Sequence, residues 1–152
     1  MLNEDYRDIL HALSEEKVRF ILVGAYALAA HGYPRATMDI DIWVKPSPQN
    51  AEAVLRALAR FGAPLHKLSR EDLLNDGTIF QIGVAPRRID IITTASGLRF
   101  DPTYRNSILV NIEGIEVRIP SIEDLIHNNC ATGRTRDLAD AEVRESLKNL
   151  EQ

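Results

Sequence analysis

The chain has a single cysteine and no long apolar stretch, and these two absences narrow its class. Cys130 is the only cysteine among 152 residues, so an internal disulfide is excluded and a reducing cytoplasm is expected. The longest apolar run, residues 20–30, contains a glycine and is too short to span a bilayer. Asn3, Glu4 and Asp5 stand where an export signal needs basic residues, so we expect neither a signal peptide nor membrane association.

The chain also lacks repeats, low-complexity tracts and a recognisable linker, which predicts one domain over residues 1–152. The formal net charge of −4 argues against strong non-specific nucleic-acid binding, which depends on neutralising phosphates with Lys and Arg. Four arginines nevertheless occur in pairs: Arg87, Arg88, Arg134 and Arg136. The pairs indicate either a local basic patch or an ordinary solvated surface, and the sequence leaves both open.

Hydrophobic periodicity predicts a mixture of helices and strands. Helices are expected over residues 2–13, 25–31 and 48–61, then from a cap at Ser121 to Cys130, and again after Gly133. Strands are expected over residues 19–23, 39–44, 78–83, 88–93, 108–112 and 115–119, the last two as a hairpin. Residues 62–77 read as a loop carrying a short helix near 70–74. The fold class is therefore α+β, a small mixed sheet flanked by helices, with the strand at 39–44 beside the first strand.

Three aspartates interrupt strands that are otherwise apolar. Asp39 and Asp41 alternate with isoleucine, so their side chains point to the same face, about 7 Å apart along the backbone. Asp90 occupies the same kind of setting, between Ile89 and Ile91. Because aspartate is a poor strand former, three such placements predict a functional role. The alternative for each residue is an ordinary strand-edge carboxylate that faces water.

Neighbouring carboxylates raise one another's pKa and destabilise a fold unless a cation neutralises them. A hard divalent cation with oxygen ligands does so, and Mg²⁺ prefers a few carboxylates together with substrate phosphate. Asp39, Asp41 and Asp90 are therefore candidate ligands of Mg²⁺, in a site that transfers a phosphoryl or nucleotidyl group.

Gly24 ends the first buried strand and precedes a helix that begins at Ala25. Backbone N–H groups at such a junction can bind a triphosphate. Most strand–glycine–helix junctions are purely structural, so this one gains weight only from the aspartates that follow it.

Taken together, Leu-Val-Gly-Ala at 22–25 and Asp-Ile-Asp-Ile at 39–42 resemble the signature of the polymerase-β-type nucleotidyltransferase superfamily. The segment between them, His-Gly-Tyr-Pro-Arg-Ala-Thr at 31–37, is similar to a short bacterial branch of abortive-infection toxin-like nucleotidyltransferases. Residues 122–126 and 131–140 resemble the C-terminal motif of that branch. The resemblance covers residues 18–143, nearly the whole chain.

The resemblance implies a nucleotidyl transfer from a nucleoside triphosphate to a hydroxyl acceptor, with RNA as one acceptor and a cognate antitoxin protein as a partner. It implies that the metal ligands and catalytic carboxylates are Asp39, Asp41 and Asp90. It also implies a nucleotide pocket formed by Gly24, Ala25, Arg35, Thr37, Arg134 and Asp137.

Two residues depart from the pattern of these relatives. Ala25 replaces a glycine or serine, and Asn129 replaces a lysine that would meet the phosphates. Asn129 follows Ile122 and Ile126 at helical spacing, a face that we expect to point inward. An amide cannot replace an ammonium against a triphosphate. The alternative to an active nucleotidyltransferase is therefore a degenerate module that binds a nucleotide or a partner without turnover. A metal-dependent phosphoesterase is a third possible function.

Three other residues favour structural roles. His31, at the end of a helix, is expected to cap it. Trp43 is expected to be a packing residue, although it could also line the active-site cleft. His127, three residues before the lone cysteine, has no second pair of ligands with which to build a zinc site.

Overall fold

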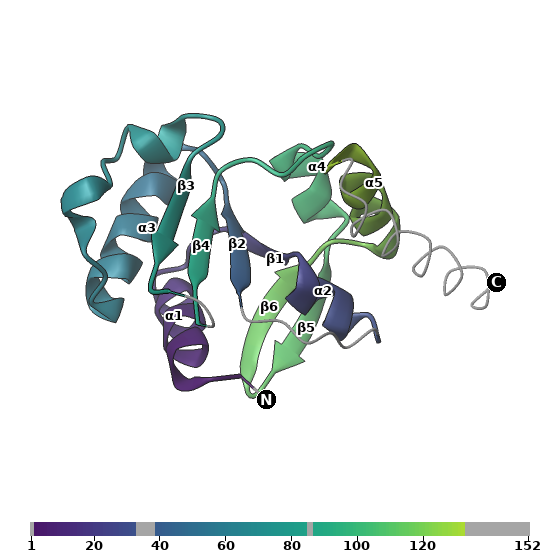
Figure 1. Cartoon of the computed structure of the whole chain (residues 1–152), viewed down its shortest axis with the longest axis horizontal. Helices are drawn as coiled ribbons and strands as arrows, with labels where there is room; N and C mark the ends of the chain where they lie inside the picture. Colours follow the sequence, from purple (N-terminus) through teal and green to yellow (C-terminus); the bar gives the residue numbers. More distant parts are fainter. Residues whose placement is uncertain (1, 33–38, 85–86, 133–152) are drawn as a thin grey trace.

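The computed structural model describes residues 2–32, 39–84 and 87–132, and its centre is a four-stranded sheet (Figure 1). The strands, in spatial order, are β1 (Phe20–Val23), β2 (Ile40–Val44), β4 (Ile89–Ile92) and β3 (Ile79–Ile82). Strands β2 and β4 are parallel, whereas β1 and β3 are antiparallel to their neighbours. The predicted mixed sheet is confirmed, and so is the position of β2 beside β1.

Helices cover the sheet on both sides (Figure 1). The described helices are α1 (Glu4–Glu15), α2 (Ala25–Ala30), α3 (Pro48–Phe61), α4 (Phe100–Arg105) and α5 (Ile122–Thr132). Two 3-10 turns, Leu65–Lys67 and Asp72–Leu74, lie in residues 62–77, where the sequence predicts a loop with a short helix. Helix α1 packs against α3, and α4 and α5 lie on the side away from them (Figure 1). The hairpin of β5 (Ile108–Ile112) and β6 (Ile115–Ile119) contacts β1 through β6.

The face of the sheet beneath α1 and α3 holds the main hydrophobic core. Ile40, Ile42 and Val44 of β2 are fully buried in it, because alternate side chains of a strand share one face. Leu10 and Leu58 contribute from the two helices. The isoleucines that alternate with the aspartates in the sequence therefore anchor β2 in the core and turn the intervening residues to the opposite face.

The opposite face carries a smaller apolar cluster around Trp43, which is 1% exposed. Ile21, Val23, Ala95 and Phe100 surround it, and the ring centroids of Trp43 and Phe100 lie 5.2 Å apart at an edge-to-face angle. Trp43 thus has the packing role that the sequence favoured. Helix α4, which supplies Phe100, was not predicted.

Helix α5 begins as predicted, with the Ser121 hydroxyl accepting a hydrogen bond from the backbone N–H of Asp124 at 3.1 Å. Its fully buried residue is Leu125, whereas Ile122 and Ile126 are only half-buried. The inward face is therefore centred on Leu125, which corrects the face expected from the two isoleucines. The last predicted helix lies outside the described residues, and in the described part no helix is long and apolar enough to cross a membrane.

Candidate active site

Asp41 and Asp90 lie side by side on neighbouring strands. They are Cα partners in the parallel ladder of β2 and β4, so their side chains point to the same face of the sheet. Val23 of β1 and Gln81 of β3 are the outer partners of this row. Residues that are 49 positions apart in the sequence are thus neighbours in the sheet. We call the pair Asp41 and Asp90 the carboxylate row.

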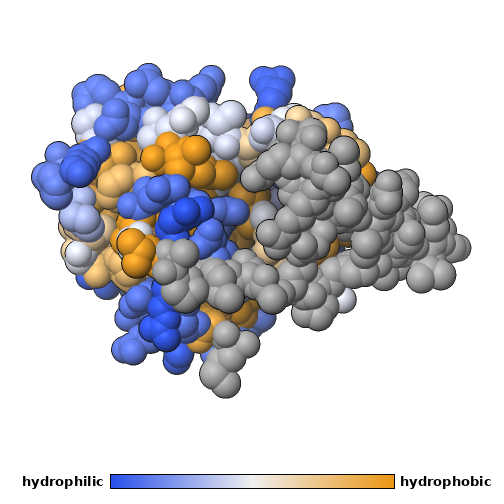
Figure 2. Space-filling model, viewed as in Figure 1, coloured by the Kyte–Doolittle hydropathy of each residue, from blue (hydrophilic) through white to orange (hydrophobic). Residues whose placement is uncertain are grey.

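Asp39 lies just before β2, and Arg88 joins it to the row. The backbone N–H of Ile40 donates to the Arg88 carbonyl at 3.0 Å, which places the two strand starts together. Arg88 Nη2 donates to Asp39 Oδ2 at 2.8 Å, and Arg88 Nε lies 3.1 Å from Asp90 Oδ1. One guanidinium therefore contacts two of the three predicted carboxylates. Hydrophilic residues gather over the strands on the face shown in Figure 2, bordered by hydrophobic ones.

The surroundings of Asp41 perturb the pKa of its carboxyl group. Burial is the main cause, and it raises the pKa of Asp41 from 3.8 to about 6. The charge of Asp90, a hydrogen bond with Asp90 and the charge of Asp39 raise the pKa further, and Arg88 opposes them. The carboxylate of Asp41 is therefore costly to ionise in the folded protein, as expected where anionic side chains converge.

Gly24 lies directly against Asp41. A Cβ at this position would come within 2.6 Å of Asp41 Oδ2, and the backbone has a φ of +73°. Both facts favour glycine, because a side chain would collide with the carboxylate and would strain the backbone. Ala25 follows and begins α2, which has six residues. The structure thus brings the predicted glycine to the predicted carboxylates.

Tyr6 of α1 reaches the same region from the other side of the sheet, a neighbour that sequence reasoning missed. Its hydroxyl donates to the Arg88 carbonyl at 3.1 Å, and its ring packs edge-on against Tyr26 at 5.6 Å. Burial, together with Tyr26, Asp39 and Asp41, raises the pKa of Tyr6 to about 12. The phenol is therefore neutral at physiological pH and acts as a hydrogen-bond donor.

Several predicted pocket residues lie outside the part of the chain that the structure describes. These are Arg35, Thr37, Arg134 and Asp137, together with the side chain of Asn129. Their predicted contacts with the nucleotide stay predictions.

The carboxylates offer the hard oxygen donors that suit Mg²⁺, and Asp90 has an unsatisfied atom. Asp90 Oδ1 is buried and accepts no hydrogen bond from the described residues, although Arg88 Nε lies close to it without hydrogen-bond alignment. Such an atom favours a cation. In the arrangement seen, however, no three His, Cys, Asp or Glu side chains within the described ranges group closely enough to hold a metal ion. The chemistry of the donors fits Mg²⁺, while their present geometry is organised around Arg88.

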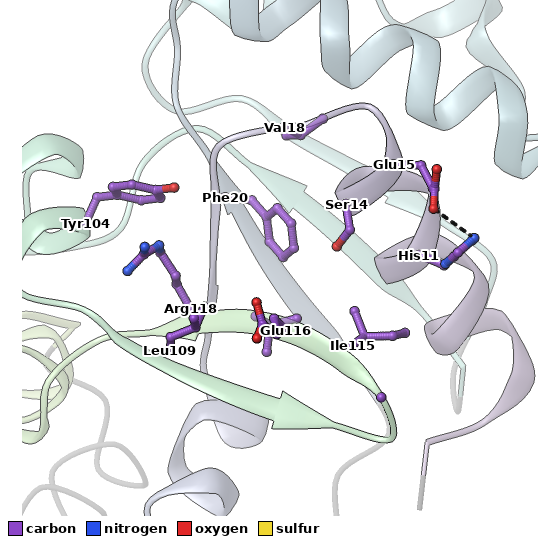
Figure 3. A pocket seen from close by; sticks show the side chains of 12 residues that line it. His11, Ser14, Glu15, Val18, Phe20, Tyr104, Leu109, Ile115, Glu116 and Arg118 are labelled. Atoms are coloured by element: carbon purple, nitrogen blue, oxygen red, sulfur yellow. Dashed lines mark ion pairs between the residues drawn. The ribbon is translucent and has the colours of Figure 1, made fainter.

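The remaining candidates have other roles. His31 Nε2 lies 2.8 Å from the Pro120 carbonyl oxygen, which fits the structural role expected at a helix end. A separate groove of about 480 Å³ lies between α1 and the β5–β6 hairpin (Figure 3). It is lined by His11 and Glu15, 3.6 Å apart, and by Phe20 on the core face of β1, but by none of the three aspartates. The carboxylate row is therefore the better candidate for group transfer.

Comparison with known proteins agrees with this fold. Residues 1–151 match a family described as nucleotidyltransferase of unknown function (DUF6036). The chain belongs to this nucleotidyltransferase family. A crystal structure of a Thermotoga maritima protein described as a nucleotidyltransferase superposes with a TM-score of 0.59 and 18% identity, covering 99% of this chain and 94% of that one. This likeness shows a shared α+β fold. None of the curated proteins matches the chain significantly.

Proposed function

We propose that this member of the nucleotidyltransferase family transfers a nucleotidyl group from a nucleoside triphosphate to a hydroxyl acceptor. The observation that carries the proposal is the contact of Gly24 with Asp41 in the row that also contains Asp90. This close approach requires glycine, because a Cβ would meet Asp41 Oδ2 at 2.6 Å. The glycine backbone and the two carboxylates thus lie together, which supports a shared site for phosphate and metal.

Asp39, Asp41 and Asp90 are the proposed ligands of Mg²⁺. Bound there, Mg²⁺ would neutralise phosphate charge and favour in-line displacement at the α-phosphorus. In that reaction the acceptor oxygen bonds to the α-phosphorus, the bond to the bridging oxygen breaks, pyrophosphate leaves and the hydroxyl proton is released.

The chain's own residues hold this arrangement by burial and backbone geometry. Asp90 is 7% exposed and fixed between Ile89 and Ile91, so its carboxylate has little freedom. Gly24 lets the backbone approach Asp41 without a side chain in the way. Because α2 has six residues, fewer than two turns, its dipole contributes little, and the missing Cβ of Gly24 is the more important feature.

The acceptor and the biological role rest on the sequence resemblance alone. The motifs at 22–25 and 39–42, with the C-terminal segment, resemble the abortive-infection toxin-like branch of the polymerase-β-type superfamily. We therefore propose RNA as the acceptor, and a toxin that is neutralised by a cognate antitoxin as the role.

The direct test incubates the pure protein with each α-labelled triphosphate, Mg²⁺ and total RNA. Incorporation of label that is lost in Asp41→Asn and in EDTA supports the proposal. An exposed carboxylate on α1, Asp8, supplies the matched control, because Asp8→Asn should transfer like wild type. The proposal is contradicted if the wild-type protein neither binds any triphosphate nor transfers label from it.

A catalytically degenerate module is the second candidate, and the ion pairs of Arg88 favour it. An arginine that already pairs with Asp39 and Asp90 partly neutralises them and reduces the need for a metal. Ala25 and Asn129 also depart from the pattern of the relatives. Triphosphate binding without transfer is the expected result in that case. Asn129→Lys separates the two candidates further, because a restored ammonium near the phosphates should raise affinity or transfer. A loss of stability without a gain in affinity would show that position 129 does not face the nucleotide.

A further inference from the structure

Arg88 occupies the place among the aspartates where a cation is expected. Its Nη2 lies 2.8 Å from Asp39 Oδ2 and 3.4 Å from Asp90 Oδ2, while Nε lies 3.1 Å from Asp90 Oδ1. The sheet register explains this position. Arg88 stands beside Asp39 at the start of the parallel pair and two residues before Asp90, so its side chain shares their face.

The charges in this cluster do not balance. Asp39, Asp41 and Asp90 carry three negative charges when ionised, and Arg88 carries one positive charge. Asp90 is nearly buried, and its side chain is only 11% exposed, so the guanidinium is its main compensation within the described residues. A buried carboxylate that lost this partner would be strongly destabilising.

The contacts of Arg88 and those of a metal ion compete with one another. Mg²⁺ binds carboxylate oxygens at about 2.0–2.1 Å with near-octahedral geometry. Binding of such an ion to the oxygens within 2.8–3.1 Å of Arg88 nitrogens is disfavoured while the guanidinium remains against them, because the two cations would repel each other at short distance. The Arg88 side chain is 34% exposed, which leaves it a route toward solvent.

We propose that Arg88 is a positioning residue that serves as an internal counter-ion: it holds Asp39 and Asp90 in the metal-free protein and withdraws when the divalent cation binds. This inference rests on the proposed function, since it assigns those carboxylates to the metal. Arg88 thereby sets how tightly the site binds the ion. Its withdrawal also leaves a freed guanidinium next to the incoming triphosphate, with which it can form charge-assisted hydrogen bonds.

The test measures binding of Mn²⁺ and of Mg²⁺ alone by isothermal titration calorimetry, on wild type, Arg88→Gln, Arg88→Lys and Arg87→Gln. Arg87 is exposed and adjacent, so Arg87→Gln removes the same charge without touching the carboxylates. We expect Arg88→Gln to bind the ion about tenfold more tightly than wild type and Arg87→Gln to be unchanged within about twofold. Arg88→Lys, which keeps the charge but loses the planar fork, should lie between them.

The melting temperature gives a second readout. Without metal, Arg88→Gln should melt below wild type, and added Mn²⁺ should raise its melting temperature more than that of wild type. If Arg88→Gln does not fold without metal, the affinity of Arg88→Lys for the metal ion, compared with that of wild type, tests the counter-ion role.

Two results would overturn the inference in distinguishable ways. Equal or weaker metal affinity in Arg88→Gln and Arg88→Lys, with clear binding by wild type, removes the counter-ion role and leaves the proposed function intact. No binding of either ion by any variant removes both the counter-ion role and the metal on which the proposed function depends.

Discussion

The replacement Asp41→Asn should stabilise the metal-free protein, and by an amount that depends on pH. The folded protein raises the pKa of Asp41 from 3.8 to about 6, so the folded state holds this proton more tightly than the unfolded state does. A group of this kind favours folding at pH values below 3.8, and its contribution is lost as pH rises toward 6. At pH 8 the wild-type protein therefore bears the full cost of an ionised Asp41, whereas the asparagine variant bears none.

The size of the effect follows from the pKa values. A shift of about two units corresponds to about 3 kcal/mol, because one unit is worth about 1.4 kcal/mol. Asp41 is half-buried, and solvent screening lowers the figure, so we expect a difference of about 1–3 kcal/mol between the two ends of the pH range. The amide of asparagine can still donate a hydrogen bond to Asp90, which keeps the local packing comparable.

The assay is urea denaturation in EDTA at pH 4 and pH 8, followed by the fluorescence of Trp43, the only tryptophan. Asp41→Asn should gain free energy of unfolding over wild type at pH 8 and little at pH 4. Asp8→Asn, an exposed carboxylate on α1, should change little at either pH. An equal difference between Asp41→Asn and wild type at the two pH values would refute the reasoning, because it would mean that burial and Asp90 do not hold a proton on Asp41.

Two other replacements test the surroundings of the row. Gly24→Ala should lower the free energy of unfolding by about 1–3 kcal/mol more than Gly62→Ala, because both sites have positive φ but only a Cβ at Gly24 meets the Asp41 carboxylate; equal losses in thermal melts would contradict the contact. Tyr6→Phe should cost about 1 kcal/mol at pH 7 by removing the hydrogen bond to the start of β4. That difference should shrink above pH 10, because the folded protein keeps the phenol protonated to about pH 12, and a constant difference would argue against its burial beside the aspartates.

Local sequence pattern was sufficient for the strands that build the site. The alternation of aspartate with isoleucine predicted both the burial of β2 and the shared face of Asp39 and Asp41, because strand periodicity depends only on neighbouring residues. The cap at Ser121 is also local, and its hydroxyl accepts the backbone hydrogen bond that marks the predicted start of α5. Each of these predictions is confirmed.

The missed features depend on contacts between distant residues. The sequence offered Arg88 only as half of an arginine pair, in a basic patch or on a solvated surface. Only the register of β4 against β2 places it between Asp39 and Asp90. Tyr6 gave the signal of an ordinary core residue of α1, since its contact with the Arg88 carbonyl spans 82 residues. Helix α4 is six residues long and contains Pro102, so its periodicity is too short to read, and packing of Phe100 on Trp43 stabilises it instead.

The central claim is that the carboxylate row binds a triphosphate together with Mg²⁺, and equilibrium binding to wild type and Asp90→Asn tests it most directly. The account predicts that wild type binds a non-hydrolysable triphosphate in Mg²⁺ and loses it in EDTA. Asp90→Asn should bind at least about tenfold more weakly in Mg²⁺, since even residues that only support a metal ligand are worth that much, while Asp8→Asn binds like wild type. Equal affinity of wild type and Asp90→Asn, or binding that is unaffected by EDTA, would contradict the account.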